Sequence, residues 1–174
     1  MSILYYDHLD SSTDAAKRLI KTGITVPTSI IARQQDKGRG QHGRHWHSEP
    51  GGLFYSFIYP YPFPFTQIES LQLKIAQVVV DAIQIHTGIL CRIKKPNDVY
   101  FEDQKCAGIL LESSSQGCEE AAQHAIIGIG LNINQASFPN TLEQTATSLK
   151  LIANRDFDMD PFIQTFHKEL PYVF

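Results

Sequence analysis

The sequence contains one long segment with helical periodicity, and short segments typical of strands lie on both sides of it. This order restricts the fold classes that the chain can adopt. Between residues 67 and 87 apolar side chains recur every three or four positions, which predicts an amphipathic helix that ends at Gly88. Its apolar stripe consists of Ile68, Leu71, Ile75, Val78, Val79, Ala82 and Ile83. Strand-like runs stand on both sides of it, so the pattern is neither a regular βαβ alternation nor all β.

The remaining elements follow from the same patterns. Strands are expected at 3–7, 28–32, 53–59, 89–93, 99–101, 107–111 and 125–133. A helix is expected from the cap at 11–13 to Gly23, and two more at 141–151 and 161–170. This order predicts an α+β fold, with helices on one face of a mixed, largely antiparallel sheet. We see no internal repeat and no linker, so residues 1–174 are expected to form one domain.

Composition and charge exclude several classes of protein. The 15 basic and 18 acidic residues leave a net charge of −3, which disfavours a surface for long polyanions such as DNA. The three cysteines are odd in number and form no CxxC pair, which favours a reducing compartment. The first ten residues lack a basic stretch before an apolar run, and no apolar run could span a bilayer. We therefore expect a cytoplasmic protein without a membrane segment.

The most unusual segment is a long loop at 34–50 that has no hydrophobic period. Three glycines in it allow a ligand close to the backbone, two arginines can bind phosphate, and a tryptophan can stack on a flat ring. These residues are Gly38, Arg39, Gly40, Gly43, Arg44 and Trp46. They indicate a nucleotide, although neither a P-loop nor a dinucleotide fingerprint is present. A solvated loop that contacts RNA explains the same residues equally well. The nearby histidines, at 42, 45 and 47, match no common zinc spacing.

Three further segments carry residues suited to binding anions. Lys94 and Lys95 end a strand before the turn Pro96-Asn97-Asp98, and Lys105 precedes an apolar strand that contains Gly108. The glycine-spaced strand at 128–134 contains Asn132, whose amide can bind phosphate or a hydrated Mg²⁺. Each segment has an ordinary alternative: a turn, a hairpin lysine, or the end of a sheet strand.

Taken together, these segments resemble the catalytic domain of the biotin–protein ligases, in the short form that has no DNA-binding domain. The resemblance runs in order through the following segments: Ser12-Thr13-Asp14, Gln35, Gly38-Arg39-Gly40, Gly43-Arg44, Trp46, Lys94, Pro96-Asn97-Asp98, Lys105, Ala107-Gly108-Ile109-Leu110, Gly128-Ile129-Gly130-Leu131-Asn132 and Ala146-Thr147-Ser148-Leu149. The glycine–arginine loop and the Lys-Cys-Ala-Gly-Ile-Leu strand are its specific parts. It implies the fold shared by biotin and lipoate ligases and resembling class II aminoacyl-tRNA synthetases.

The resemblance also implies a two-step reaction. ATP activates biotin as biotinyl-5′-AMP, and a lysine of a biotin carboxyl carrier protein, an acetyl-CoA carboxylase subunit, then takes the biotinyl group. The implied catalytic residues are Lys105, Arg39 and Lys94. The implied biotin-binding residues are Ser12, Thr13, Gln35, Gly38, Arg39, Lys105 and Gly108. The implied ATP- and adenylate-binding residues are Arg39, Gly40, Arg44, Trp46, Asn97, Asp98 and Asn132, the last also through Mg²⁺. A homodimer is compatible with the resemblance, and a DNA partner is not expected.

The sequence departs from the family pattern at three places. Gln41 stands where many relatives have a basic residue, and Lys95 stands where the family has tryptophan. The chain ends at Phe174, so we expect the family's small C-terminal β domain to be absent. Two alternatives remain open: a lipoate or octanoate ligase of the same fold, and a non-catalytic RNA-binding module that uses the glycine–arginine loop.

Overall fold

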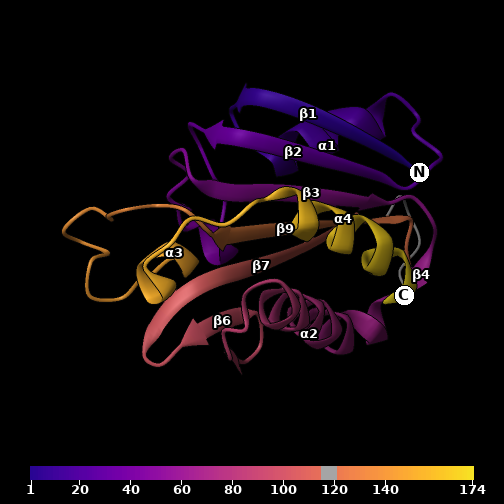
Figure 1. Cartoon of the computed structure of the whole chain (residues 1–174). Helices are drawn as coiled ribbons and strands as arrows, with labels where there is room; N and C mark the ends of the chain where they lie inside the picture. The colour runs from indigo at the N-terminus through magenta and orange to yellow at the C-terminus, as the bar shows by residue number, and fades with distance from the viewer. Residues whose placement is uncertain (115–120) are drawn as a thin grey trace.

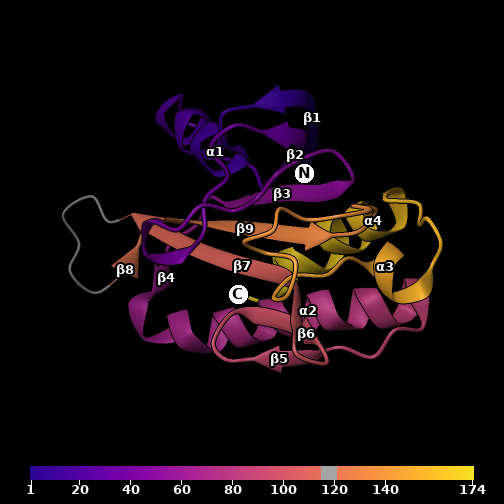
Figure 2. The same ribbon diagram turned by 90° about the vertical axis from the view of Figure 1, so that its left-hand side faces the viewer.

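The computed structural model describes residues 1–114 and 121–174, and its framework is a twisted seven-stranded sheet. The strand order is β1-β2-β3-β9-β7-β6-β5, which Figure 2 shows from top to bottom. The strands are β1 (Ser2–Leu9), β2 (Thr28–Gln35), β3 (Gly52–Tyr59), β5 (Arg92–Lys94), β6 (Asp98–Phe101), β7 (Gln104–Ser114) and β9 (His124–Asn132). A separate short pair joins β4 (Phe63–Pro64) to β8 (Ala121–Ala122). Only β1 and β2 pair in parallel among these strands, which confirms the mixed, largely antiparallel sheet.

Three of the four described helices lie where the sequence predicts them, within a few residues at each end. The helices are α1 (Ser12–Lys21), α2 (Ile68–Thr87), α3 (Leu149–Ala153) and α4 (Asp160–Glu169), with 3₁₀ turns at Gln41–Gly43, Phe65–Gln67 and Leu170–Tyr172. Ser11 caps α1 by accepting a hydrogen bond from the Asp14 backbone N–H, and α2 ends at Gly88, whose φ is 78°. Within the described residues, no helix combines the length and the apolar character needed to cross a membrane.

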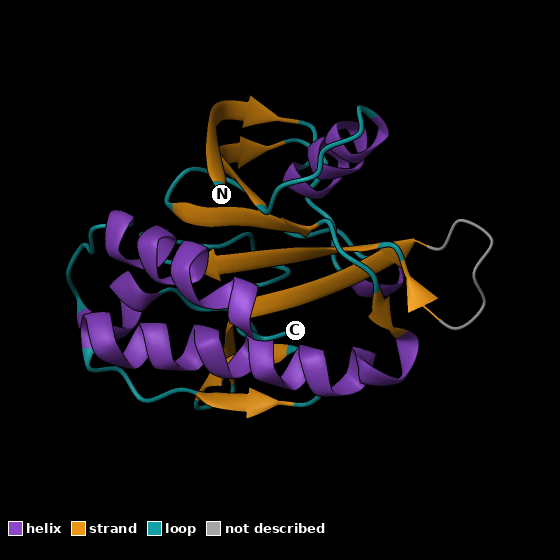
Figure 3. Cartoon of the chain, turned by 90° about the vertical axis from the view of Figure 1, so that its right-hand side faces the viewer, coloured by secondary structure: helices purple, strands orange, loops and turns teal. Residues whose placement is uncertain are grey.

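The sheet has two faces of different composition, because alternate side chains of each strand point to opposite sides. In β9, Ile127, Ile129 and Leu131 pack in the main core, beneath α2 and α4. Figures 1 and 3 show these two helices lying together across one face of the sheet. The intervening β9 positions, among them Gly128 and Gly130, face the other side. The first face therefore holds the main core, and on the second face β9 has two positions without a side chain.

Helix α1 lies on that second face, where Ala15 and Ala16 pack against Ile30, Ile58 and Ile126. In Figure 2 it lies beside β1, β2 and β3, on the side of the sheet away from α2. The expectation that helices occupy one face thus holds for α2 and α4 and is wrong for α1. The physical reason is that β2, β3 and β9 each have apolar residues on both faces, and these residues are buried only if helices pack on both faces.

The helix expected at 141–151 is also wrong. Residues 141–145 form turns, Ala146 forms a parallel bridge with Lys105, and only Leu149–Ala153 are helical. The Lys105 N–H donates to the Thr145 carbonyl at 2.8 Å, and the Thr147 N–H donates to the Lys105 carbonyl at 3.0 Å. Pairing with β7 therefore takes the backbone groups that a helix would have used. Ser148 then caps the short α3.

Candidate functional site

A cavity of about 220 Å³ lies on the second face of the sheet, between α1, the loop that follows β2, and the ends of β6, β7 and β9. Many of the residues singled out by the sequence line it. These are Ser12, Thr13, Gln35, Arg39, Gly40, Arg44, Trp46, Asn97, Asp98, Lys105, Gly108 and Asn132. Segments far apart in the chain therefore meet at one place, as the resemblance implies.

The floor of the cavity is a pair of glycines on neighbouring strands. Gly108 of β7 and Gly130 of β9 are register partners, and the indole of Trp46 lies on them. A Cβ at Gly108 would lie 2.8 Å from Trp46 Cζ3, and a Cβ at Gly130 would overlap the same indole. The absence of side chains here makes a flat slot, which the indole of Trp46 occupies in this structure. The Nε1 atom of Trp46 is buried and has no hydrogen-bond partner among the described residues.

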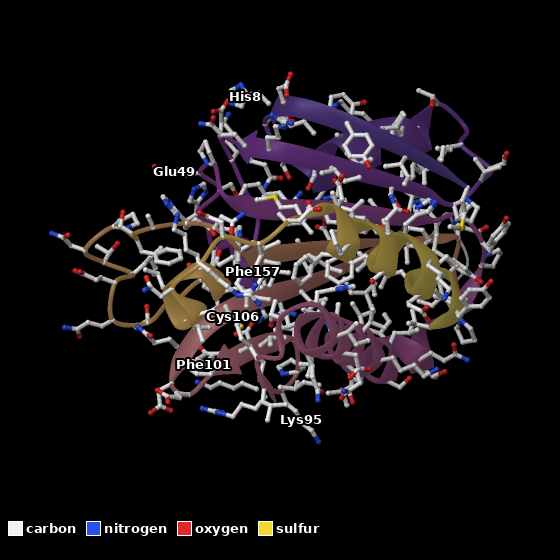
Figure 4. The ribbon with its side chains drawn as sticks, in the orientation of Figure 1. His8, Glu49, Lys95, Phe101, Cys106 and Phe157 are labelled. Carbon is white, nitrogen blue, oxygen red and sulfur yellow. The ribbon has the colours of Figure 1, made fainter. Side chains whose placement is uncertain are left out.

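A β-bulge brings Lys105 to the cavity. The β6–β7 register shifts between Val99 and Tyr100, so that Cys106 has no direct partner. Without this extra residue, strict alternation would place Lys105 on the same face as Ala107, in the main core. Instead Cys106 points into the core and Lys105 lines the cavity. Cys106 lies among the central strands in Figure 4. Cys91 and Cys106 are free thiols, and Cys118 lies outside the described residues.

The ammonium group of Lys105 is held by its neighbours. Its Nζ lies 2.6 Å from Asp98 Oδ1 and 5.2 Å from the centroid of the Trp46 ring. Both side chains of the ion pair are largely buried, with exposed fractions of 27% and 23%. A partly desolvated, ion-paired cation with a fixed position can stabilise negative charge that develops beside it.

A cluster of hydroxyl groups lies at the other end of the cavity, beside α1. Ser56 Oγ donates to Ser12 Oγ at 2.9 Å, and its distance to Thr13 Oγ1 is 3.4 Å. Gln35 accepts from the Ser12 N–H through Oε1 at 2.6 Å and donates to Ser48 Oγ through Nε2 at 2.9 Å. These donors and acceptors suit a compact polar ligand group such as a urea.

The sequence reasoning missed Ser56. It lies directly opposite Gly128 in the β3–β9 pair, on the cavity face, and is fully buried. A polar residue at a fully buried position of an otherwise apolar strand was the available signal.

The glycine–arginine loop folds back on itself over the cavity. Arg39 and His45 form an isolated bridge, and the Trp46 N–H donates to the Gly38 carbonyl at 2.8 Å. Gly38 does not line the cavity. A Cβ there would collide with Ser48 and with the Trp46 backbone, so the glycine allows the two arms of the loop to close.

The two arginines of the loop have different surroundings. Arg39 donates to Asp14 Oδ1 at 2.6 Å and to Glu112 Oε1 at 2.9 Å. The hydrogen bond to Asp14 raises the pKa of the Arg39 guanidinium above its ordinary value. Among the described residues, the Arg44 side chain has one hydrogen bond, from Nε to the Gln41 carbonyl at 3.3 Å, and no carboxylate partner. The contacts of Arg39 with two carboxylates were not anticipated from the sequence.

Lys94 lies outside the cavity. Its Nζ lies 4.7 Å from the centroid of the Tyr100 ring, and Tyr100 itself lines the cavity, so one aromatic ring separates the lysine from the site. Lys95 is exposed, and Figure 4 shows it at the lower rim of the molecule. A lysine at this position therefore displaces nothing from the core.

Two asparagines at the site make hydrogen bonds that fix the backbone. Asn97 Nδ2 donates to the Ile109 carbonyl at 2.8 Å. Asn132 Nδ2 donates to the Thr147 carbonyl at 3.0 Å, and its Oδ1 accepts from Gln135 Nε2 at 3.1 Å. The described residues contain no group of three His, Cys, Asp or Glu side chains suited to a metal. The amide oxygen of Asn132 is thus already used within the protein, and Asp98 is the carboxylate among the described lining residues that fits a magnesium ion held chiefly by phosphates and water.

Comparison with known proteins identifies the family of the chain. Residues 7–132 match the biotin/lipoate A/B protein ligase family. The bifunctional ligase/repressor BirA of Bacillus subtilis is 36% identical over 165 residues, which cover 93% of this chain and 50% of BirA. The biotin–[acetyl-CoA-carboxylase] ligase of Paracoccus denitrificans is 33% identical over 138 residues, which cover 78% of this chain and 57% of that protein. The chain thus spans about half the length of these curated relatives.

The solved structures extend the likeness to the fold. The biotin protein ligase of Aquifex aeolicus, in complex with biotin and ATP, superposes with a TM-score of 0.83 at 30% identity and covers 99% of this chain and 69% of its own. LipL1 of Plasmodium falciparum, in complex with lipoate, has a TM-score of 0.59 at 10% identity, with coverage of 96% and 62%, which shows the fold alone. The chain belongs to the biotin/lipoate A/B protein ligase family.

Proposed function

We propose that this chain activates biotin with ATP and transfers the biotinyl group to a lysine of a carrier protein. The observation that carries the proposal is the position of Lys105. The bulge directs this cation to a cavity that Ser12 and Thr13 of the hydroxyl cluster and residues of the glycine–arginine loop also line. The relative from Paracoccus denitrificans is a biotin–[acetyl-CoA-carboxylase] ligase, and the ligase structure from Aquifex aeolicus is a complex with biotin and ATP.

In the first step, a biotin carboxylate oxygen attacks the α-phosphorus of ATP, and pyrophosphate leaves. Two anions must meet, so a cation between them lowers the barrier. Lys105 would bridge the carboxylate and the α-phosphate, Arg39 and Arg44 would bind on the phosphate side, and Mg²⁺ would neutralise charge on the phosphates. Ser12, Thr13 and Gln35 would hold the ureido ring.

In the second step, the amine of the carrier lysine attacks the biotinyl carbonyl, an amide bond forms, and AMP leaves. The mixed anhydride hydrolyses easily in water, so it has to be shielded until the carrier arrives. The loop that carries Trp46 covers the cavity and would supply this shield. We propose the biotin carboxyl carrier protein of acetyl-CoA carboxylase as the acceptor and the cytoplasm as the compartment.

A pyrophosphate-release assay with biotin, lipoate and octanoate tests the proposal directly. Biotin is expected to support release at low concentration, with biotinyl-AMP detected by mass spectrometry. Release with lipoate or octanoate and not with biotin would assign the chain to the other branch of the same family.

The RNA-binding alternative is disfavoured by the net charge of the protein, which is −3, because surfaces that bind long polyanions usually carry a basic excess. A salt-dependent mobility shift with RNA, together with no pyrophosphate release, would restore that alternative.

A further inference from the structure

We propose that Asp14 and Glu112 are positioning residues: they hold the glycine–arginine loop, and with it Trp46, over the cavity by binding Arg39. We call the cluster of Asp14, Lys17, Arg39 and Glu112 the latch. Its consequence for the reaction, slower escape of the adenylate, rests on the proposed function. Its effect on the position of Trp46 does not.

The latch joins three elements that are far apart in the chain. Arg39 reaches Asp14 of α1 with one guanidinium nitrogen, at 2.6 Å, and Glu112 of β7 with the other, at 2.9 Å. Lys17 reaches the same Glu112 oxygen at 3.0 Å and lies 3.9 Å from Asp14. Two cations thus alternate with two carboxylates, which is more favourable than an isolated surface pair.

Both carboxylates are attached to rigid structure. Asp14 lies in the first turn of α1, which Ser11 caps. Glu112 is in register with Ile126 of β9 on the cavity face, and its side chain is only 23% exposed. Its Oε2 is buried and has no hydrogen-bond partner among the described residues. The carboxylate therefore depends on Arg39 and Lys17 for compensation of its charge.

Backbone contacts within the loop connect Arg39 to Trp46, which lines the cavity. The Arg39–His45 bridge and the hydrogen bond from Trp46 N–H to the Gly38 carbonyl connect the two arms of the loop. Fixing Arg39 against α1 and β7 therefore fixes the strand arm that bears Trp46. The loop needs no bound phosphate to be held in this way.

The protein contains one tryptophan, so its fluorescence reports the position of the loop without any ligand. We expect the acrylamide quenching constant of Trp46 to rise about fivefold in the double variant Asp14→Asn with Glu112→Gln, and less in each single variant. The matched control is Arg18→Gln, which removes an ion pair with Asp10 from the same helix but leaves the latch intact. Unchanged quenching in a double variant that melts at the parent temperature would overturn the proposal.

A charge exchange separates positioning from simple loss of stability. The exchange is made in an Asp14→Asn, Lys17→Gln background, so that neither new side chain meets a like charge. In that background Glu112→Arg should expose Trp46 further, and adding Arg39→Glu should restore the quenching of the background, because the opposite charges meet again. Failure of the Arg39→Glu substitution to restore that quenching, in a variant with a normal circular dichroism spectrum, would also overturn the proposal.

The reaction supplies an independent readout. In the Asp14→Asn, Glu112→Gln variant the rate of biotinyl-AMP formation is expected to change little, while its rate of escape, followed by rapid gel filtration, rises about fivefold. Equal escape from variant and parent would contradict the positioning role. If biotin gives no adenylate with the parent protein, the proposed function fails, and the fluorescence result still decides the latch.

Discussion

Lys105 and Asp98 form a 2.6 Å ion pair at the point where β6 and β7 lose their regular register. The carboxylate keeps the ammonium group over the glycine floor, although the lysine has four rotatable bonds along its side chain. An incoming carboxylate or phosphate would join a cation whose position is already set. Preorganisation of this kind reduces the cost of arranging charge during the reaction.

Replacement of Lys105 tests this arrangement. Lys105→Ala is expected to lower the rate of adenylate formation by about 10²-fold or more, because a fixed charge facing both reacting anions is lost. Single-turnover formation of biotinyl-AMP measures it. Lys95→Ala, which changes an exposed lysine nearby, is the control and should retain the parent rate. Near-parent turnover in Lys105→Ala would refute the role given to this lysine.

Arg39→Gly should allow biotinyl-AMP to leave the site and label lysines of bystander proteins. The substitution removes both the guanidinium near the phosphate side and its contacts with Asp14 and Glu112. Retention of radiolabelled adenylate on a filter gives the measurement, with Arg33→Gln, an exposed arginine on β2, as the control. The prediction fails if both variants retain the adenylate as the parent does.

Gly130→Ala should displace the indole of Trp46, since a Cβ at this position would overlap the ring. Overpacking of this kind costs about 1–3 kcal/mol unless the loop moves away. The fluorescence maximum of Trp46 is expected to shift to the red, and the affinity for biotin, measured by calorimetry, is expected to fall. Ile129→Val, on the opposite face of the same strand, should leave both quantities unchanged. An unshifted spectrum in Gly130→Ala would show that the slot tolerates a methyl group.

The loss of thermal stability at acid pH should depend in part on Asp10. Its hydrogen bonds to Arg18 and to the Ser11 N–H lower its pKa from 3.8 to about 2. A carboxyl with a depressed folded-state pKa stabilises the fold above its unfolded pKa, and this stabilisation is lost as pH falls through the folded value. Asp10→Asn should therefore melt at a lower temperature than the parent at pH 6, and the two melting curves should converge near pH 2. A difference that does not change with pH would exclude this linkage.

Local patterns predicted most of the fold. The α2 repeat, the cap at Ser11 and the stop at Gly88 are short-range signals, and the structure confirms the elements they define. The helix expected at 141–151 failed because its backbone pairs with Lys105, about 40 residues earlier in the chain. The position of α1 on the opposite face of the sheet was not predicted. Apolar residues on both sides of a strand show that both faces are buried, but they do not show which element covers each face.

The candidate site could be predicted only in part. Glycines, the loop arginines and Lys105 stand out by residue type, and they meet at the cavity. The bulge that directs Lys105 is invisible to a rule of strict alternation, which would have buried this lysine. Ser56 and Glu112 have no local motif, and the motif that contains Asp14 does not indicate its ion pair with Arg39, because these contacts arise when α1, β3, β7 and the loop fold together. Placing them required the three-dimensional structure.

Alternate positions of β9 perform separate tasks. Ile127, Ile129 and Leu131 pack beneath α2 and α4, whereas Gly128, Gly130 and Asn132 face the cavity. Alternate residues of one strand thus serve core packing and the shape of the cavity. Substitutions at Gly128, Gly130 or Asn132 alter the cavity side of the strand and leave the side chains of the main core unchanged. A strand of this kind allows related proteins to share one fold and to differ at the site.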